Sequence, residues 1–233
     1  MRRLESSKKT LLLAALLTLV VCALVASGIR PYDRPTWLME VAPVLIALPV
    51  LIATRRRFEL TTLAYVLVAI HAFVLIVGGA YTYARVPLGF DLQHWLGLAR
   101  NPYDRIGHFA QGFVPAVLAR EILLRASPLR PGRWLSFLVV CVALAISACY
   151  ELIEWAAALA LGEGADEFLG TQGDPWDTQS DMAMALVGAV AALLLLSGWH
   201  DRQLAALCAG QRDCVSGAAS GDRGEAETRP SVK

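Results

Sequence analysis

The sequence predicts an all-α protein, a polytopic bundle of about six transmembrane helices. Of its 233 residues, 56% are hydrophobic and only 18% are charged, whereas soluble domains carry about a quarter charged residues. The mean hydropathy is +0.51. The apolar residues also fall in long blocks rather than at amphipathic spacing, which is typical of segments that cross a lipid bilayer.

Six blocks are long enough, because a spanning helix needs about 20 mainly apolar residues. We expect these helices at residues 10–28, 37–54, 60–80, 104–124, 134–161 and 181–199. The first block follows a basic start, as a signal peptide would, but its apolar run is long for one and further blocks follow, so we expect it to stay uncleaved. Residues 1–209 then form one transmembrane domain. Residues 210–233 are small, polar and charged, which predicts a disordered cytoplasmic tail.

Basic residues gather in alternate connections, which predicts that both termini lie in the cytoplasm, because positively charged loops stay on that side of a bacterial inner membrane. The connection at 161–181 has no Lys or Arg and several acidic residues, as expected on the opposite side. The segment 81–103 is a mild exception. It carries Arg85 and Arg100, with Arg105 just beyond it, and several aromatic rings, and we expect a loop at the membrane–water interface. The basic residues that set the orientation are Arg2, Arg3, Lys8, Lys9, Arg55, Arg56, Arg57, Arg125, Arg130 and Arg133.

Two other classes of protein are disfavoured. The five cysteines show no paired C-x-x-C spacing, so neither a disulfide framework nor a cysteine zinc site is indicated. No basic stripe with interleaved aromatic residues is present, so we expect no nucleic-acid partner. The partner that the composition predicts is the lipid bilayer.

Three pairs of ionisable residues lie inside or at the edge of predicted spans, where charged side chains are costly and usually functional. Within each pair the residues are three or four positions apart, so their side chains share one face of a helix. The predicted topology brings all three pairs to the non-cytoplasmic end of the bundle. The pairs are Asp104 with His108, Glu151 with Glu154, and Asp177 with Asp181.

The leading hypothesis for these pairs is a metal site, because a histidine nitrogen with several carboxylate oxygens suits zinc or manganese. We expect His108, Glu154 and Asp181 to bind the ion, with Asp104 either joining them or orienting His108. Glu151 is the candidate general base, and Asp177 is a second candidate catalytic carboxylate. Such a site would activate water in a metal-dependent membrane hydrolase, acting on a lipid-linked or other envelope molecule.

Two alternatives remain open. Embedded His, Asp and Glu side chains also carry protons in transporters and relays. The charged residues could instead only tie helices together, with Arg100 or Arg105 neutralising Glu151 or Asp177. Gly188 lies two turns after Asp181 and predicts close approach of a neighbouring helix. We expect His94 and His200 to be solvated.

The same motifs resemble a known family. Tyr-Asp104-Arg-Ile-Gly-His108-Phe, Tyr-Glu151-Leu-Ile-Glu154-Trp and Gly173-Asp-Pro-Trp-Asp177-x3-Asp181 are similar to motifs of the YjdF-like inner-membrane proteins. This resemblance spans the chain from the first to the sixth predicted helix and implies a six-helix bacterial membrane protein, but no reaction. A looser similarity connects the chain to VanZ-like proteins of the cell envelope, with Arg105 and Glu154 standing where that family shows Lys and Gln.

Overall fold

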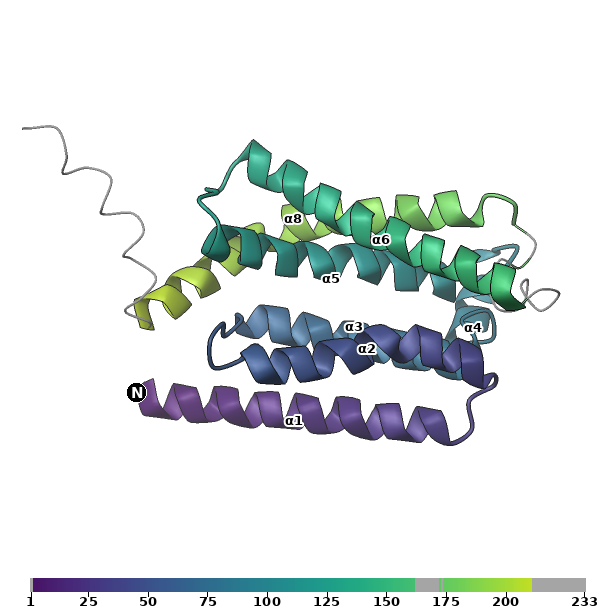
Figure 1. Ribbon diagram of the computed structural model, residues 1–233, viewed down its shortest axis with the longest axis horizontal. Helices are drawn as coiled ribbons and strands as arrows, with labels where there is room; N and C mark the ends of the chain where they lie inside the picture. Colours follow the sequence, from purple (N-terminus) through teal and green to yellow (C-terminus); the bar gives the residue numbers. More distant parts are fainter. Residues whose placement is uncertain (1, 162–171, 173, 211–233) are drawn as a thin grey trace, which may run out of the picture.

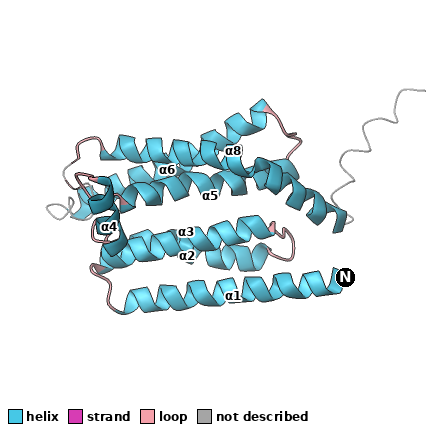
Figure 2. Ribbon diagram, turned by 180° about the vertical axis from the view of Figure 1, so that it is seen from behind, coloured by secondary structure: helices cyan, strands magenta, loops and turns pink. Residues whose placement is uncertain are grey.

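The computed structural model describes residues 2–161, 172 and 174–210, and this part of the chain is helical throughout apart from its connections (Figures 1 and 2). The helices are α1 (Arg2–Ile29), α2 (Arg34–Thr54), α3 (Thr62–Tyr81), α4 (Pro87–Leu96), α5 (Tyr103–Ala126), α6 (Arg133–Leu161) and α8 (Asp177–Gly210). The predicted all-α class is thus confirmed. The predicted tail lies outside the described residues except for Gly210, which ends α8.

The long helices run side by side and alternate in direction, so the bundle has two ends (Figure 1). At the α4 end, α1, α3 and α6 finish while α2, α5 and α8 begin. The opposite end holds the N-terminus and the connections after α2 and α5. Helices α1, α2 and α3 form one group around Val41, Val44 and Ile76, whereas α5, α6 and α8 form another around Ala116 and Val139. Packing of α3 on α5 joins the two groups.

Five of the described helices are long and apolar enough to cross a membrane: α1 from Ser7, α2, α3, α6 to Ala160, and α8 to Ala209. Helix α5 has 24 residues, which gives a length of about 36 Å, but it is too polar to meet the same criterion. It nevertheless packs against α3, α6 and α8. The sixth span therefore stays a prediction. Five polar or charged residues of α5 are buried inside the bundle: Asp104, His108, Gln111, Arg120 and Glu121.

The most extensive helix pairing joins α5 to α8, and two glycines permit it. A Cβ on Gly112 of α5 would overlap the carbonyl oxygen of Ala185 on α8, and a Cβ on Gly188 of α8 would overlap the carbonyl oxygen of Phe109 on α5. Small residues let helix backbones approach in this way. The close approach predicted at Gly188 is confirmed.

The segment 81–103 is not a simple loop, so that prediction was wrong. Residues Pro87 to Leu96 form α4, with Pro87 in the first turn and Gly97 in the left-handed conformation at its C-terminal end. Proline is favoured at the start of a helix and glycine just after its end. These two signals are visible in the sequence, but a helix of this length is easily hidden between long spans. Helix α4 lies across the end of the bundle, at a steep angle to the long helices (Figure 2).

Candidate functional site

Three predicted metal ligands meet at the α4 end of the bundle. Asp104 and His108 lie one turn apart near the start of α5, and Asp181 lies just over one turn into α8. One ligand atom from each residue falls within 4.8 Å of the other two. All three side chains are buried, with Asp181 only 2% exposed. The close α5–α8 packing at Gly112 and Gly188 therefore brings together residues that are more than 70 positions apart in the sequence.

The separations within this group suit ligands of one ion better than hydrogen bonds. His108 Nε2 lies 3.6 Å from Asp104 Oδ1 and 3.9 Å from Asp181 Oδ2, whereas N–H···O bonds are about 2.7–3.2 Å long. Two ligands about 2.0–2.2 Å from a shared zinc ion stand about 3.3 Å apart in a tetrahedral site. They can stand about 4 Å apart where the angle at the ion is wider. The donor set, one imidazole and two carboxylates, also fits a first-row divalent ion.

Gln111 orients the imidazole. Its Oε1 lies 2.9 Å from His108 Nδ1, and because an amide oxygen only accepts, Nδ1 carries the proton and donates it. The neutral ring then presents the lone pair of Nε2 toward Asp104 and Asp181. A lone pair facing two carboxylates is unfavourable unless a cation lies among them, either a metal ion or a proton on Nε2. The arrangement thus has two consistent readings, an ion site or an imidazolium held by two carboxylates.

The two glutamates of α6, Glu151 and Glu154, differ in their burial and in their relation to His108. Glu151 is buried, and its Oε1 lies 3.6 Å from His108 Nδ1. That oxygen and Asp181 Oδ1 are both buried without a hydrogen-bond partner in the described part of the chain, a costly state that usually indicates a bound water, ion or ligand. Glu154 is half-buried and contributes no ligand atom to the group of three.

Asp177 stands apart from this group. It forms a short hydrogen-bonded ion pair with Arg100, and Asp174 lies 3.7 Å from Arg100 and 3.5 Å from Arg105. Burial lowers the pKa of the Arg100 guanidinium, but the bond to Asp177 outweighs it, so the pKa ends above its ordinary value. The predicted neutralisation of Asp177 by Arg100 is therefore confirmed, and it leaves Asp177 in an ion pair at the rim of the site.

Sequence reasoning missed a buried pair beside the site. Glu40 on α2 is 8% exposed and accepts a hydrogen bond of 2.9 Å from the hydroxyl of Tyr150 on α6. This bond links the two helix groups at the α4 end. The signal was present, since a carboxylate within an apolar block usually has a partner, but sequence alone did not identify Tyr150.

A second polar cluster, at the opposite end of the bundle, was also missed. Its centre is Glu121 of α5, which is fully buried and accepts bonds from Thr61, Arg125 and His200. His200 of α8 is 1% exposed, so the expectation that it is solvated was wrong. We expected His200 to be solvated because it follows an apolar block in the sequence. Helix α8 instead continues to Gly210 and packs His200 against α5.

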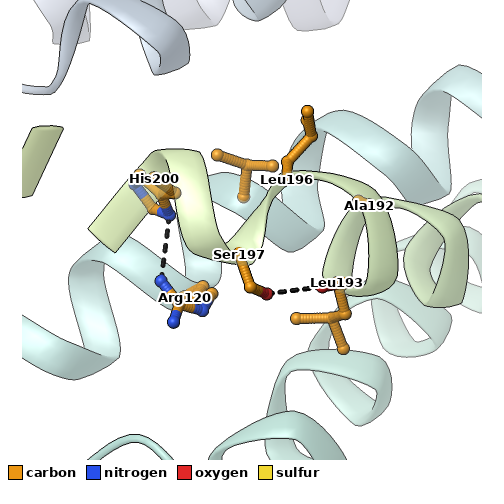
Figure 3. A pocket seen from close by; sticks show the side chains of 7 residues that line it. Arg120, Ala192, Leu193, Leu196, Ser197 and His200 are labelled. Carbon is orange, nitrogen blue, oxygen red and sulfur yellow. Dashed lines mark hydrogen bonds between the residues drawn. The ribbon is translucent and has the colours of Figure 1, made fainter. Parts of the chain in front are cut away.

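The hydrogen-bond partners define the protonation of His200. Arg120 Nη1 lies 3.2 Å from His200 Nδ1 (Figure 3), and because arginine only donates, Nδ1 is the acceptor. Nε2 then carries the proton and donates to Glu121 Oε2 over 3.1 Å. A narrow hollow between α5 and α8 borders Arg120 and His200 and is otherwise lined mainly by apolar side chains. It lies at the end of the bundle away from His108.

The comparisons with known proteins agree with this architecture. The family described as "Predicted membrane protein (DUF2238)" matches residues 12–202. The chain is also 58% identical to "Inner membrane protein YjdF" of Escherichia coli (strain K12) over 197 residues, which cover 84% of this chain and 94% of the relative. No solved structure matches. The family match, the close relative and the apolar helices identify the chain as an integral inner-membrane protein that belongs to the DUF2238 family.

Proposed function

We propose that this protein binds a divalent first-row metal ion, zinc or manganese, through Asp104, His108 and Asp181, and acts on a lipid-linked or other envelope molecule. The observation that carries the proposal is the convergence of three buried ligand atoms from α5 and α8 within 4.8 Å. It is supported by Glu151 Oε1 and Asp181 Oδ1, two buried oxygens with no hydrogen-bond partner among the residues that the structure describes. A bundle of helices that contributes carboxylates and histidines to its interior is a known way to build such a site.

The chemistry that such an ion supplies is polarisation of a phosphoryl or acyl oxygen and activation of water, which points to hydrolysis as the reaction class. Within the chain, Gln111 keeps the proton of His108 on Nδ1 and so leaves Nε2 free to bind the ion. Glu151 has a buried oxygen near His108 and suits a general base. Glu154, one turn further along α6, is better placed as an outer partner than as a ligand.

The site is proposed to face the non-cytoplasmic side. Basic residues dominate the opposite end of the bundle, at Arg55, Arg56 and Arg57 and again at Arg130 and Arg133, and such segments stay in the cytoplasm. A substrate would then come from the outer leaflet or the space beyond it, where lipid-linked envelope intermediates are handled.

Metal content tests the proposal. The detergent-purified protein and its His108→Gln and Asp181→Asn variants are measured by elemental mass spectrometry after incubation with zinc or manganese and removal of excess ion. The matched controls are His94→Gln and Asp91→Asn, which change the same residue types on the exposed surface of α4. We expect about one ion per chain in the parent and the controls and a loss of most of it in the two site variants.

A folded parent that binds no ion after supplementation overturns the proposal. The alternative that then applies is an imidazolium of His108 held between Asp104 and Asp181, which ties α5 to α8. In that case Asp181→Asn lowers the melting temperature of the protein without any change in metal content.

A further inference from the structure

Helix α4 carries an apolar stripe of four residues, of which the described part of the protein leaves three exposed and Leu92 half-buried. Leu88, Leu92, Trp95 and Leu96 are spaced at i, i+4, i+7 and i+8, so they lie on one face. Leu88 is 55% exposed, Trp95 76% and Leu96 66%. Asp91 and His94 are exposed beside this stripe. Short helices with one apolar and one polar face are typical of segments that lie in a membrane surface.

We propose that α4 lies flat in the headgroup region of the bilayer, with Leu88, Leu92, Trp95 and Leu96 inserted toward the acyl chains. Its direction supports this, because α4 crosses the ends of the spanning helices instead of running alongside them (Figure 2). Tryptophan suits such a position, since its ring is apolar and its N–H remains close to water. The partner of this surface is therefore lipid.

Other apolar and aromatic side chains are exposed at the same end of the bundle. Ile29 at the end of α1 is 66% exposed, and Tyr32 and Tyr81 are 57% and 45% exposed. These residues stand where the candidate spans α1 and α3 reach the membrane surface. Arg85, just before α4, places its guanidinium 4.2 Å from the Tyr32 ring centroid, so the basic and aromatic groups that favour a headgroup layer meet there.

Asn101 fixes α4 to the bundle. Its side-chain amide donates hydrogen bonds of 3.1 Å to the carbonyl oxygens of Ala84 and Val86, just before the helix. The same side chain packs so closely on Gly89 that a Cβ there would overlap it. Asn101 also accepts a bond from the backbone N–H of Tyr103, the first residue of α5. The depth of α4 in the membrane therefore determines the depth at which α5 begins.

The contacts of Asn101 determine how deep the candidate site lies in the membrane. The class of ligand inferred from this depth rests on the proposed function and makes it more specific. Asp104 is three residues beyond Asn101, and His108 is four residues further, which is about 6 Å along the axis of α5. With α4 in the headgroup layer, the ligands lie just below it, at the level of headgroups and the first acyl carbons. The ligand class that fits is the polar head of a lipid or lipid-linked molecule.

Spin labels on α4 test the inference without any use of metal or activity. In a variant of the full chain with its five native cysteines replaced, single labels are placed by Leu88→Cys, Leu92→Cys, Leu96→Cys, Asp91→Cys and His94→Cys. Each protein is reconstituted in phosphatidylglycerol–phosphatidylethanolamine vesicles. Collision with oxygen, which concentrates in lipid, is compared with collision with a water-soluble nickel complex.

We expect labels at 88, 92 and 96 to favour oxygen by several-fold over the nickel complex, and labels at 91 and 94 to show the reverse. Equal access to the nickel complex at all five positions overturns the inference, since α4 would then stand in water. A failure of metal binding leaves this result unchanged, so the depth of α4 and the metal site are tested separately. Replacement of Leu88 and Leu96 together by Ser, with the bundle still folded, is expected to move the label at 92 toward water.

Discussion

Replacement of Gly112 by alanine is expected to destroy the candidate metal site without altering any ligand. The added Cβ would overlap the carbonyl oxygen of Ala185, which is rigid backbone. Non-bonded carbon atoms are about 3.5–4.0 Å from their neighbours, so we estimate that α5 and α8 must separate by more than about 1 Å at this point. Alanine in a helix normally stabilises it by up to about 1 kcal/mol relative to glycine, but overpacking costs about 1–3 kcal/mol, so a net loss is expected.

The consequence for the site follows from its geometry. His108 is one turn before Gly112, and its Nε2 lies 3.9 Å from Asp181 Oδ2 across the same interface. Two oxygen or nitrogen ligands about 2.1 Å from one ion stand at most about 4.2 Å apart. A further separation of about 1 Å exceeds this limit. We therefore expect Gly112→Ala to lose most of the bound metal that the parent retains.

The assay is metal content after supplementation, together with the melting temperature of the purified protein in detergent. Gly198→Ala is the matched control, because no other part of the described structure lies within 4 Å of a Cβ at that position of α8. It is expected to keep the metal of the parent, and its melting temperature should equal or slightly exceed that of the parent, because alanine favours a helix more than glycine does. If Gly112→Ala binds metal as tightly as Gly198→Ala, the argument that helix separation controls the site is refuted.

Three further outcomes are expected. Glu121→Ala removes a fully buried carboxylate that pairs with Arg125 and His200 and should cost about 3–5 kcal/mol, seen as a large fall in the melting temperature. Tyr150→Phe removes the donor to the buried Glu40 and should cost about 1–3 kcal/mol in the same assay. Burial, followed by the charge of Glu40, raises the pKa of the Tyr83 phenol well above its ordinary value. A raised pKa gives stability that is lost as the pH rises above about 10, where the unfolded phenol ionises, and Tyr83→Phe should flatten this fall in an alkaline titration of the melting temperature.

Two of these outcomes have a control on the same protein. Asp201→Ala removes a carboxylate that is 48% exposed and paired with Arg120, so it should cost less than Glu121→Ala, whose carboxylate is fully buried. If Asp201→Ala lowers the melting temperature as much as Glu121→Ala does, burial is not the reason that Glu121 contributes to stability. Tyr32→Phe changes a phenol that is 57% exposed, so it should leave the alkaline slope as it is.

Much of the fold was predictable because hydrophobic blocks report membrane spans directly. The expected block at 104–124 corresponds to α5, and the last expected helix at 181–199 is the central part of the longer α8. The helix α4 was not predicted, because its ten residues give a periodic signal over less than three turns. The ends of α8 were misjudged because polar residues that pack against α5 resemble solvated ones in the sequence.

The candidate site was predictable in part for a similar reason. Asp104 with His108 follows from helical spacing, and their meeting with Asp181 follows from the alternating direction of the spans. The choice between Glu151 and Glu154 did not follow, because residues three apart share a helix face and only the packing decides which one reaches His108. Whether an ion is bound stays a prediction. The partners of Glu40 and Glu121 come from other helices, and no spacing in the sequence identifies them.

The polarity of α5 bears on how the protein enters the membrane during synthesis. Charged residues cost up to about 2.5–3.5 kcal/mol each at the centre of an isolated span, and less near its ends. Helix α5 carries Asp104, Arg105, Arg120, Glu121 and Arg125. Two of their partners, His200 and Asp201, lie on α8, which emerges from the ribosome much later. We expect α5 to remain at the insertion machinery until α6 and α8 arrive. A chain truncated before α8 should leave α5 exposed to proteases that act on poorly inserted segments.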